Sequence, residues 1–385
     1  MMNNQRWLSI SFLAFFFTWG VFLPYWTGWL TIEKGLTVTA ASVIMGAGMV
    51  ARALSTFLIF PYMTQRISLI RTMRWLSFSA LILALLYLPN SSFIVLLVIT
   101  ILFSAIYPMI LPAVESGASI LIKTDRIHYG KSRSFGSFAY TVALLIIGAA
   151  TAIWSEQAIL YLMIAGLAAS TLFFMRQAPA ALQVNPVKTD KIKYSSDIKA
   201  LFSSKGFAVV LLLVILLQGA HASYYNFGFI FLDDLGVNGF YIGVILNIAV
   251  IFEILFFIQA DKWLGNMRVS TMFLIAGIGS TVRWLAIFLF PFTSVFIGSQ
   301  LLHAASFGVA HFAFIKFISE KLPHHQIAAA QGMYAAFAMS LSTAILTFPG
   351  GYLYDISPRL AFLGMIVCTV PSIFIVFLTR KKYAY

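Results

Sequence analysis

The chain has 385 residues, of which 61% are hydrophobic and only 10% are charged, and its formal net charge at pH 7 is +13. Soluble domains carry about 25% charged residues, so this composition excludes a soluble globular protein and indicates an integral membrane protein. A single cysteine, Cys368, excludes a disulfide framework and a cysteine-based metal site.

Twelve apolar segments follow one another along the chain, and each approaches or exceeds the roughly 20 residues that a membrane-spanning helix needs. They lie near residues 8–30, 40–61, 72–89, 92–118, 134–153, 157–175, 207–232, 238–260, 269–290, 293–318, 326–349 and 359–379. The first is too long and too aromatic for a cleaved signal peptide, so we expect it to be retained. The sequence shows no phosphate-binding loop, nucleophile elbow or zinc-helix motif, so it gives no support to an ATP-driven pump or a hydrolase, and we expect no enzymatic activity.

The basic residues predict the orientation. With the N-terminus in the cytoplasm, 21 of the 25 lysines and arginines fall in loops or ends on that side, and only Lys34 and Arg359 on the other. Because cytoplasmic loops are enriched in Lys and Arg, we expect both termini to be cytoplasmic. The positive net charge then reflects topology and does not indicate a nucleic-acid partner.

The longest polar stretch, residues 176–206, divides the chain into six segments plus six. We therefore predict an all-α membrane protein with two pseudo-symmetric six-helix bundles, residues 1–175 and 207–385, joined by a cytoplasmic linker. This layout is typical of major facilitator transporters, whose halves rock against each other. The alternative is a fused duplication that has no transport role.

Ionisable side chains within the predicted spans cost at least ~2.5–3.5 kcal/mol each at the bilayer centre, so each needs a partner or a function. They are Arg52, Glu115, Arg133, Glu253, Arg283, His303 and His311. A helix advances about 1.5 Å per residue, so the depth of each residue below the outer membrane surface can be counted from the outer end of its span. By this count Arg283, His303 and His221 lie at similar depths, and Glu253 and His311 lie in a deeper layer.

A polar aromatic stripe interrupts the seventh segment. His221, Tyr224 and Tyr225 share one face if residues 207–232 form a continuous helix. Lipid offers such groups no partner, so we expect them to line a protein cavity that holds substrate. Further candidates for that cavity are Tyr25 and Trp26, which follow a helix-bending Pro24, and Tyr334.

These residues favour proton-coupled uptake of an anion. Arginine stays charged, so Arg52 and Arg283 suit an anion anchor. An apolar cavity disfavours the ionised form of a carboxylate, so we expect Glu253 first, and Glu115 second, to carry the proton. The expected relays are His221, His303 and His311. The structural alternative is that Glu253–Arg283 and Glu115–Arg133 are static ion pairs.

Several motifs carry a resemblance to a known family. They are FLPYW at 22–26, GAGMVARAL at 46–54, YGKSRSFGS at 129–137, LQGAHASYYNF at 217–227, VRW at 282–284 and LHAASFGVAH at 302–311. The chain resembles the phenylpropionate permeases, which are proton symporters of the major facilitator superfamily, and more distantly the lactose permeases. In the latter, an acid–arginine pair similar to Glu115 and Arg133 contacts the sugar. Similar phenylpropionate permeases have Asp at the position of Glu115, so the longer acid could reshape the pocket.

The resemblance implies a secondary active transporter of the bacterial cytoplasmic membrane that works by alternating access. It would import a small aromatic carboxylate such as 3-phenylpropionate with protons, as a monomer, driven by the proton gradient without cofactor or metal. Residues 261–268 resemble the D-R-x-G-R gate loop of the superfamily, so Asp261 would latch the gate. The alternative transporters are a sugar or nucleoside importer and a drug/proton antiporter. A different class would be a non-transporting sensor or a channel.

Overall fold

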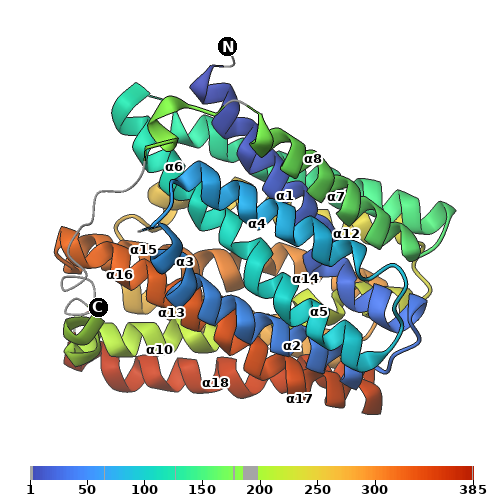
Figure 1. The fold of residues 1–385 in the computed structure, drawn as a ribbon. Helices are drawn as coiled ribbons and strands as arrows, with labels where there is room; N and C mark the ends of the chain where they lie inside the picture. Colours follow the sequence, from blue (N-terminus) through green and yellow to red (C-terminus); the bar gives the residue numbers. More distant parts are fainter. Residues whose placement is uncertain (1–2, 65, 126, 177, 185–197, 384) are drawn as a thin grey trace. The chain divides into compact units, whose positions relative to one another are not determined.

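A computed structural model describes residues 3–64, 66–125, 127–176, 178–184, 198–383 and 385. The regular elements in these ranges are all helical, without a strand (Figure 1). A helix satisfies its backbone donors and acceptors internally, which is the requirement that a lipid environment imposes on an apolar chain. The prediction of an all-α membrane protein is therefore confirmed.

The described chain forms two compact units. The first unit contains Met1–Thr189 and Asn238–Val244. Its helices are α1 (Asn4–Gly28), α2 (Val38–Leu54), α3 (Phe60–Thr64), α4 (Leu69–Leu85), α5 (Phe93–Ile106), α6 (Ile110–Asp125), α7 (Tyr129–Ile153) and α8 (Gln157–Met175). A π-helical turn at Ser55–Ile59 joins α2 to α3, and a 3-10 turn at Tyr107–Met109 joins α5 to α6.

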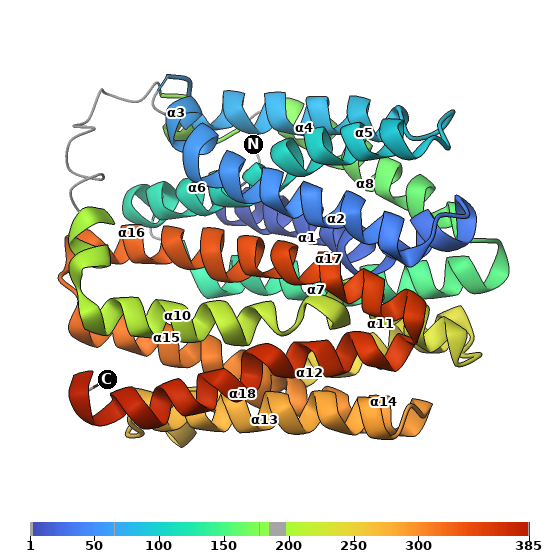
Figure 2. The same ribbon diagram turned by 90° about the horizontal axis from the view of Figure 1, so that it is seen from below.

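The second unit contains Asp190–Val237 and Ile245–Tyr385. Its helices are α10 (Lys205–Gly219), α11 (Ala222–Asp234), α12 (Gly239–Leu264, whose first residues, up to Val244, belong to the first unit), α13 (Val269–Leu289), α14 (Thr293–His303), α15 (Val309–Lys321), α16 (His324–Met333), α17 (Ser342–Ile356) and α18 (Pro358–Tyr383). Two π-helical turns, Ala304–Gly308 and Tyr334–Leu341, connect α14 to α15 and α16 to α17. Helices α13 and α18 run side by side (Figure 2).

Eleven spans of described helix are long and apolar enough to cross a membrane. The remaining predicted segment, 72–89, forms α4, which has 17 residues and is therefore only about 26 Å long. It is followed by a turn in which the Asn90 side chain donates to the Leu86 carbonyl, 2.6 Å away. Pro89 in this turn has no N–H to extend the helix. Part of the predicted linker, residues 177 and 185–197, lies outside the described residues, as does Arg126 of a predicted basic loop.

The predicted span over residues 207–232 is found within one candidate span, Lys205–Asp234, but its helix is interrupted, because α10 ends at Gly219 and α11 begins at Ala222. The His221 ring explains the break. Its Nδ1 lies 2.9 Å from the Leu217 carbonyl, which in an unbroken helix would accept the backbone N–H of His221. That N–H instead bonds the Gln218 carbonyl at 3.1 Å, and the helix restarts with Tyr225 N–H bonded to His221 O.

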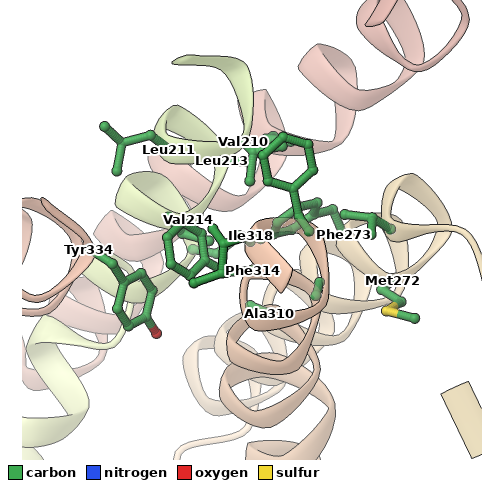
Figure 3. Packing of buried hydrophobic residues seen from close by; sticks show 14 of the residues in the cluster. Val210, Leu211, Leu213, Val214, Met272, Phe273, Ala310, Phe314, Ile318 and Tyr334 are labelled. Carbon is green, nitrogen blue, oxygen red and sulfur yellow. The ribbon is translucent and has the colours of Figure 1, made fainter. Parts of the chain in front are cut away.

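An apolar cluster holds the second unit together on one side of this break. It includes Val214 of α10 and Phe314 and Ile318 of α15 (Figure 3). The Tyr334 ring stacks on Phe314 with 4.6 Å between centroids. Figure 3 shows the Tyr334 hydroxyl pointing away from the cluster, which leaves this polar group free to meet the polar side chains of the unit.

Candidate functional site

The centre of the site is Arg283 on α13, whose side chain is fully buried. Its Nη1 lies 2.8 Å from Nδ1 of His303, at the end of α14. The guanidinium carbon lies 4.4 Å from the centre of the Tyr224 ring and 4.5 Å from that of Trp284. Because a guanidinium can only donate, Nδ1 of His303 must accept this hydrogen bond. The guanidinium also donates, over longer distances, to Ser306 Oγ at 3.4 Å and Gln300 Oε1 at 3.5 Å, so neutral acceptors and two aromatic faces hold the buried charge.

His303 connects Arg283 to Glu253 of α12. Its Nε2 lies 3.2 Å from Oε2 of Glu253. With Nδ1 accepting from Arg283, the proton of the neutral ring is on Nε2, which donates to the Glu253 carboxylate. Glu253, which the sequence placed in a deeper layer than His303, therefore reaches His303 with its carboxylate.

His221 is held by both ring nitrogens. Nδ1 donates to the Leu217 carbonyl, so Nε2 accepts from the Ser306 hydroxyl, 3.0 Å away. The predicted stripe does gather at the site, although the helix is broken. The Tyr224 hydroxyl donates to Gln300 Oε1 at 2.9 Å, and the Tyr225 ring lies 6.0 Å from that of His221. Both tyrosine rings also lie against His303, at 5.5 and 6.4 Å.

A column of three rings extends the site along α14 and α15. The rings of His303 and Phe307 are nearly parallel with 5.3 Å between centroids, and those of Phe307 and His311 with 6.1 Å. Nδ1 of His311 lies 2.8 Å from the Tyr334 hydroxyl, which accepts from the Gln218 amide at 3.0 Å. The π-helical turn Ala304–Gly308 lies within this column, as such turns often do at functional sites.

The sequence analysis missed five members of the site: Gln218, Trp284, Gln300, Ser306 and Phe307. A signal for the two glutamines was present, because a buried amide in an apolar span needs a hydrogen-bonding partner much as a charge does. Ser306 and Phe307 follow His303 by three and four residues, so they share its helical face.

The first unit holds a second arginine, Arg52, in the last turn of α2. Its guanidinium lies 4.8 Å from the centre of the Trp19 ring, a residue that the sequence analysis did not single out. Arg52 borders a small hollow whose other lining residues are Trp19, Phe22, Leu23, Met45, Gly48, Met49, Ser104 and Pro108. The hollow is thus mostly apolar, with one cation at its edge.

The predicted pair of Glu115 and Arg133 also lies in the first unit. Arg133 Nε is 3.7 Å from Glu115 Oε1, and both side chains are about one-third exposed, at 34% and 36%. The Tyr129 hydroxyl donates to the other carboxylate oxygen at 2.9 Å, and Arg133 covers the Phe16 ring at 4.2 Å. An ion pair with this exposure contributes only about 0–1 kcal/mol, so it is a weak structural tie.

Three other predicted residues have different surroundings. Tyr25 is fully buried and its hydroxyl donates to the Leu144 carbonyl at 3.2 Å. Trp26 is also fully buried and stacks on Trp29 with 4.4 Å between ring centroids. Asp261 is exposed near the end of α12, and within the described part of the chain no ion pair holds its carboxylate. The described residues contain no His, Cys, Asp and Glu cluster that could bind a metal.

Comparisons with known proteins cover nearly the whole chain. The sequence model of the MFS_1 like family matches residues 5–364. The chain is 28% identical over 375 residues to the probable 3-phenylpropionic acid transporter of Escherichia coli (strain K12), covering 97% of this chain and 98% of that protein. It is 24% identical over 381 residues to the maltose permease of Geobacillus stearothermophilus, covering 97% and 94%. The crystal structure of the nucleoside transporter NupG superposes with a TM-score of 0.83 and 16% identity over 100% of both chains.

Proposed function

The chain belongs to the MFS_1 like family and is a membrane transporter, not an enzyme, and on that premise we propose that it imports a small aromatic carboxylate with protons. The E. coli relative is named for 3-phenylpropionic acid, whereas other relatives are named for maltose or nucleosides. The chemistry of the buried site in the second unit favours the aromatic acid among these substrates.

The observation that carries this proposal is the partner of Arg283. Its fully buried guanidinium donates to Nδ1 of His303 and, over longer distances, to Ser306 and Gln300, all of which are neutral and supply no countercharge. A buried charge costs several kcal/mol unless an opposite charge and hydrogen bonds compensate it, roughly as in buried ion pairs. A substrate carboxylate would provide both, since carboxylates bind guanidinium groups bidentately. The rings of Tyr224 and Trp284 beside the guanidinium would contact an aromatic substrate.

His303 would couple the binding of substrate to the uptake of a proton. A carboxylate that binds Nη1 of Arg283 competes with His303 Nδ1 for the same donor. Once released, Nδ1 can accept a proton, and the resulting imidazolium would be stabilised by the Glu253 carboxylate at Nε2. Glu253 and His303 would then hold the transported proton together, and the ring column to His311 would extend toward Tyr334.

The remaining parts of the proposal follow from topology. We expect both termini in the cytoplasm of a bacterial inner membrane, because 21 of the 25 basic residues fall on that side. Transport would proceed by alternating access of the two halves, driven by the proton gradient without a bound cofactor. The transporter would act as a monomer, with Asp261 at its gate and with Arg52, Arg133, Tyr25 and Trp26 available to contact substrate in other conformations.

A binding screen tests the proposal directly. Purified protein is heated with 3-phenylpropionate, with its neutral amide, with maltose and with uridine, and the unfolding midpoint is recorded. We expect the acid alone to raise the midpoint in wild-type protein and not in Arg283→Gln. An equal shift with the amide would refute recognition of an anion, and a shift only with maltose or uridine would assign the site to a sugar or nucleoside.

A further inference from the structure

A larger hollow lies at one end of the second unit, about 18 Å along α13 from Arg283. Its volume is about 880 Å³, and it lies between the start of α13 and the last turns of α15 and α18. This volume is within the range of roughly 300–1,000 Å³ that small-molecule sites occupy. Its charged lining residues are Arg268, Lys316, Lys321, Arg380, Lys381 and Glu320.

The lining has a strong excess of positive charge. Glu320 forms an ion pair with Lys316, whose Nζ also donates to the Gly265 carbonyl at 2.8 Å. The structure gives no ion pair, within its described ranges, to the other four cations. Like charges that line one hollow repel each other and create a positive potential that attracts anions.

The backbone around the hollow favours an anion as well. Helix α13 begins at Val269, and Arg268 at its N-cap position makes no side-chain capping hydrogen bond. In the first turn, the Ser270 N–H donates to the main-chain oxygen of Tyr385, which also lines the hollow, at 3.3 Å, and the Thr271 N–H donates to the Arg268 carbonyl at 3.0 Å. The positive end of a helix dipole favours anions, and here the start of α13 lines the same hollow as the cations of α15 and α18.

The outer face of α18 indicates which anion would fit. Phe374, Phe377 and Leu378 are 63%, 50% and 79% exposed and occupy one helical face. Lys381 lies one helical turn beyond this face, and the guanidinium of Arg380 lies 4.8 Å from the Phe377 ring. A molecule that carries a phosphate and apolar chains would satisfy the cations and the apolar face together.

We propose that this hollow binds the phosphate group of an anionic phospholipid, with the acyl chains lying along α18. Arg and Lys are the side chains that bind phosphate in proteins, and basic pockets at the ends of membrane helices bind such head groups. The site is separate from Arg283 and His303, so it does not depend on the identity of the transported substrate.

The test uses the full-length protein purified in detergent. The unfolding midpoint and the number of lipids retained in native mass spectrometry are measured with phosphatidylglycerol, with phosphatidylcholine and with inorganic phosphate. Two double variants are compared, Arg380→Gln/Lys381→Gln in the hollow and Lys262→Gln/Lys382→Gln as a control. The control removes the same charge from the ends of α12 and α18, at residues that do not line the hollow.

We expect phosphatidylglycerol alone to be retained and to raise the midpoint of the wild type and the control. The hollow variant should lose most of both effects, and 1 M salt should weaken them because it shortens the Debye length to about 3 Å. Equal losses in the two variants would mean general surface attraction and would overturn the site. A shift of the same size with inorganic phosphate or phosphatidylcholine would overturn the assignment to an anionic lipid.

Discussion

The guanidinium of Arg283 and the Nδ1 atom of His303 lie 2.8 Å apart, and this contact determines which ring nitrogen carries the proton. While Arg283 donates to Nδ1, His303 cannot be protonated there, and its Nε2–H points to Glu253. Displacement of Arg283 by a substrate carboxylate would therefore change what His303 can do with a proton. Three of the following predictions test this relationship.

Replacement of Arg283 by Gln should abolish high-affinity binding of an aromatic acid. Hydrogen bonds to charged groups contribute roughly 1.5–3 kcal/mol, so we expect Kd to rise by about 10- to 100-fold. Calorimetric titration of purified protein with 3-phenylpropionate measures it. The matched control is Arg359→Gln, which removes an exposed arginine near the Phe288 ring and should leave Kd unchanged. An unaltered Kd in Arg283→Gln would rule out Arg283 as the anion anchor.

Replacement of Glu253 by Gln should separate binding from proton coupling. The amide keeps the size of the side chain but cannot stabilise an imidazolium at His303, so uptake driven by a pH gradient should be lost while counterflow exchange remains. Both are measured in proteoliposomes with radiolabelled substrate. Glu33→Gln, at an exposed acid after α1, is the control. Normal accumulation in Glu253→Gln would exclude this carboxylate as a proton carrier, and Glu115→Gln would then be examined next.

Two substitutions of His303 should have different effects, because the amide of Asn lies near the position of Nδ1 of the ring, whereas the amide of Gln lies near the position of Nε2. The amide oxygen of Asn can occupy the Nδ1 position and still accept from Arg283, but its side chain is too short to reach Glu253. We therefore expect His303→Asn to bind substrate while losing accumulation against a gradient. His303→Gln removes the acceptor that competes with substrate for Nη1 of Arg283, so it should bind substrate at least as tightly as His303→Asn and should also lose accumulation. If His303→Asn accumulates substrate normally, His303 does not hold the proton.

The end of α10 should require glycine at position 219, because it packs closely against residues of α17. A methyl group there would lie 2.9 Å from the Ser342 side chain and 3.0 Å from Leu346. Such overpacking costs about 1–3 kcal/mol, more than the roughly 1 kcal/mol by which Ala favours helix over Gly. We expect Gly219→Ala to lower the thermal unfolding midpoint. Gly298→Ala is the control, since nothing lies within 4 Å of a methyl group at that position, and it should leave the midpoint unchanged or raise it. Equal midpoints in the two variants would contradict tight packing at Gly219.

Much of the candidate site could be found by looking for polar residues inside apolar spans. This criterion found Arg283, His303 and Glu253 because any ionisable group in lipid needs a partner. It could not tell which groups meet, so it separated Glu253 from His303, which contact each other at 3.2 Å. It also passed over Phe307, because a phenylalanine in an apolar helix is not distinctive until its ring is found between His303 and His311.

The amino-acid sequence alone determined that this protein is an all-helical, multi-pass membrane protein, because the bilayer selects for the length and hydropathy of each segment. Tertiary structure decided the break at His221, the π-helical turn after His303 and the order Arg283–His303–Glu253. These features depend on the rotation of each helix and on which side-chain atom reaches which partner. Hydropathy does not encode such distances, because residues far apart in the chain set them through packing.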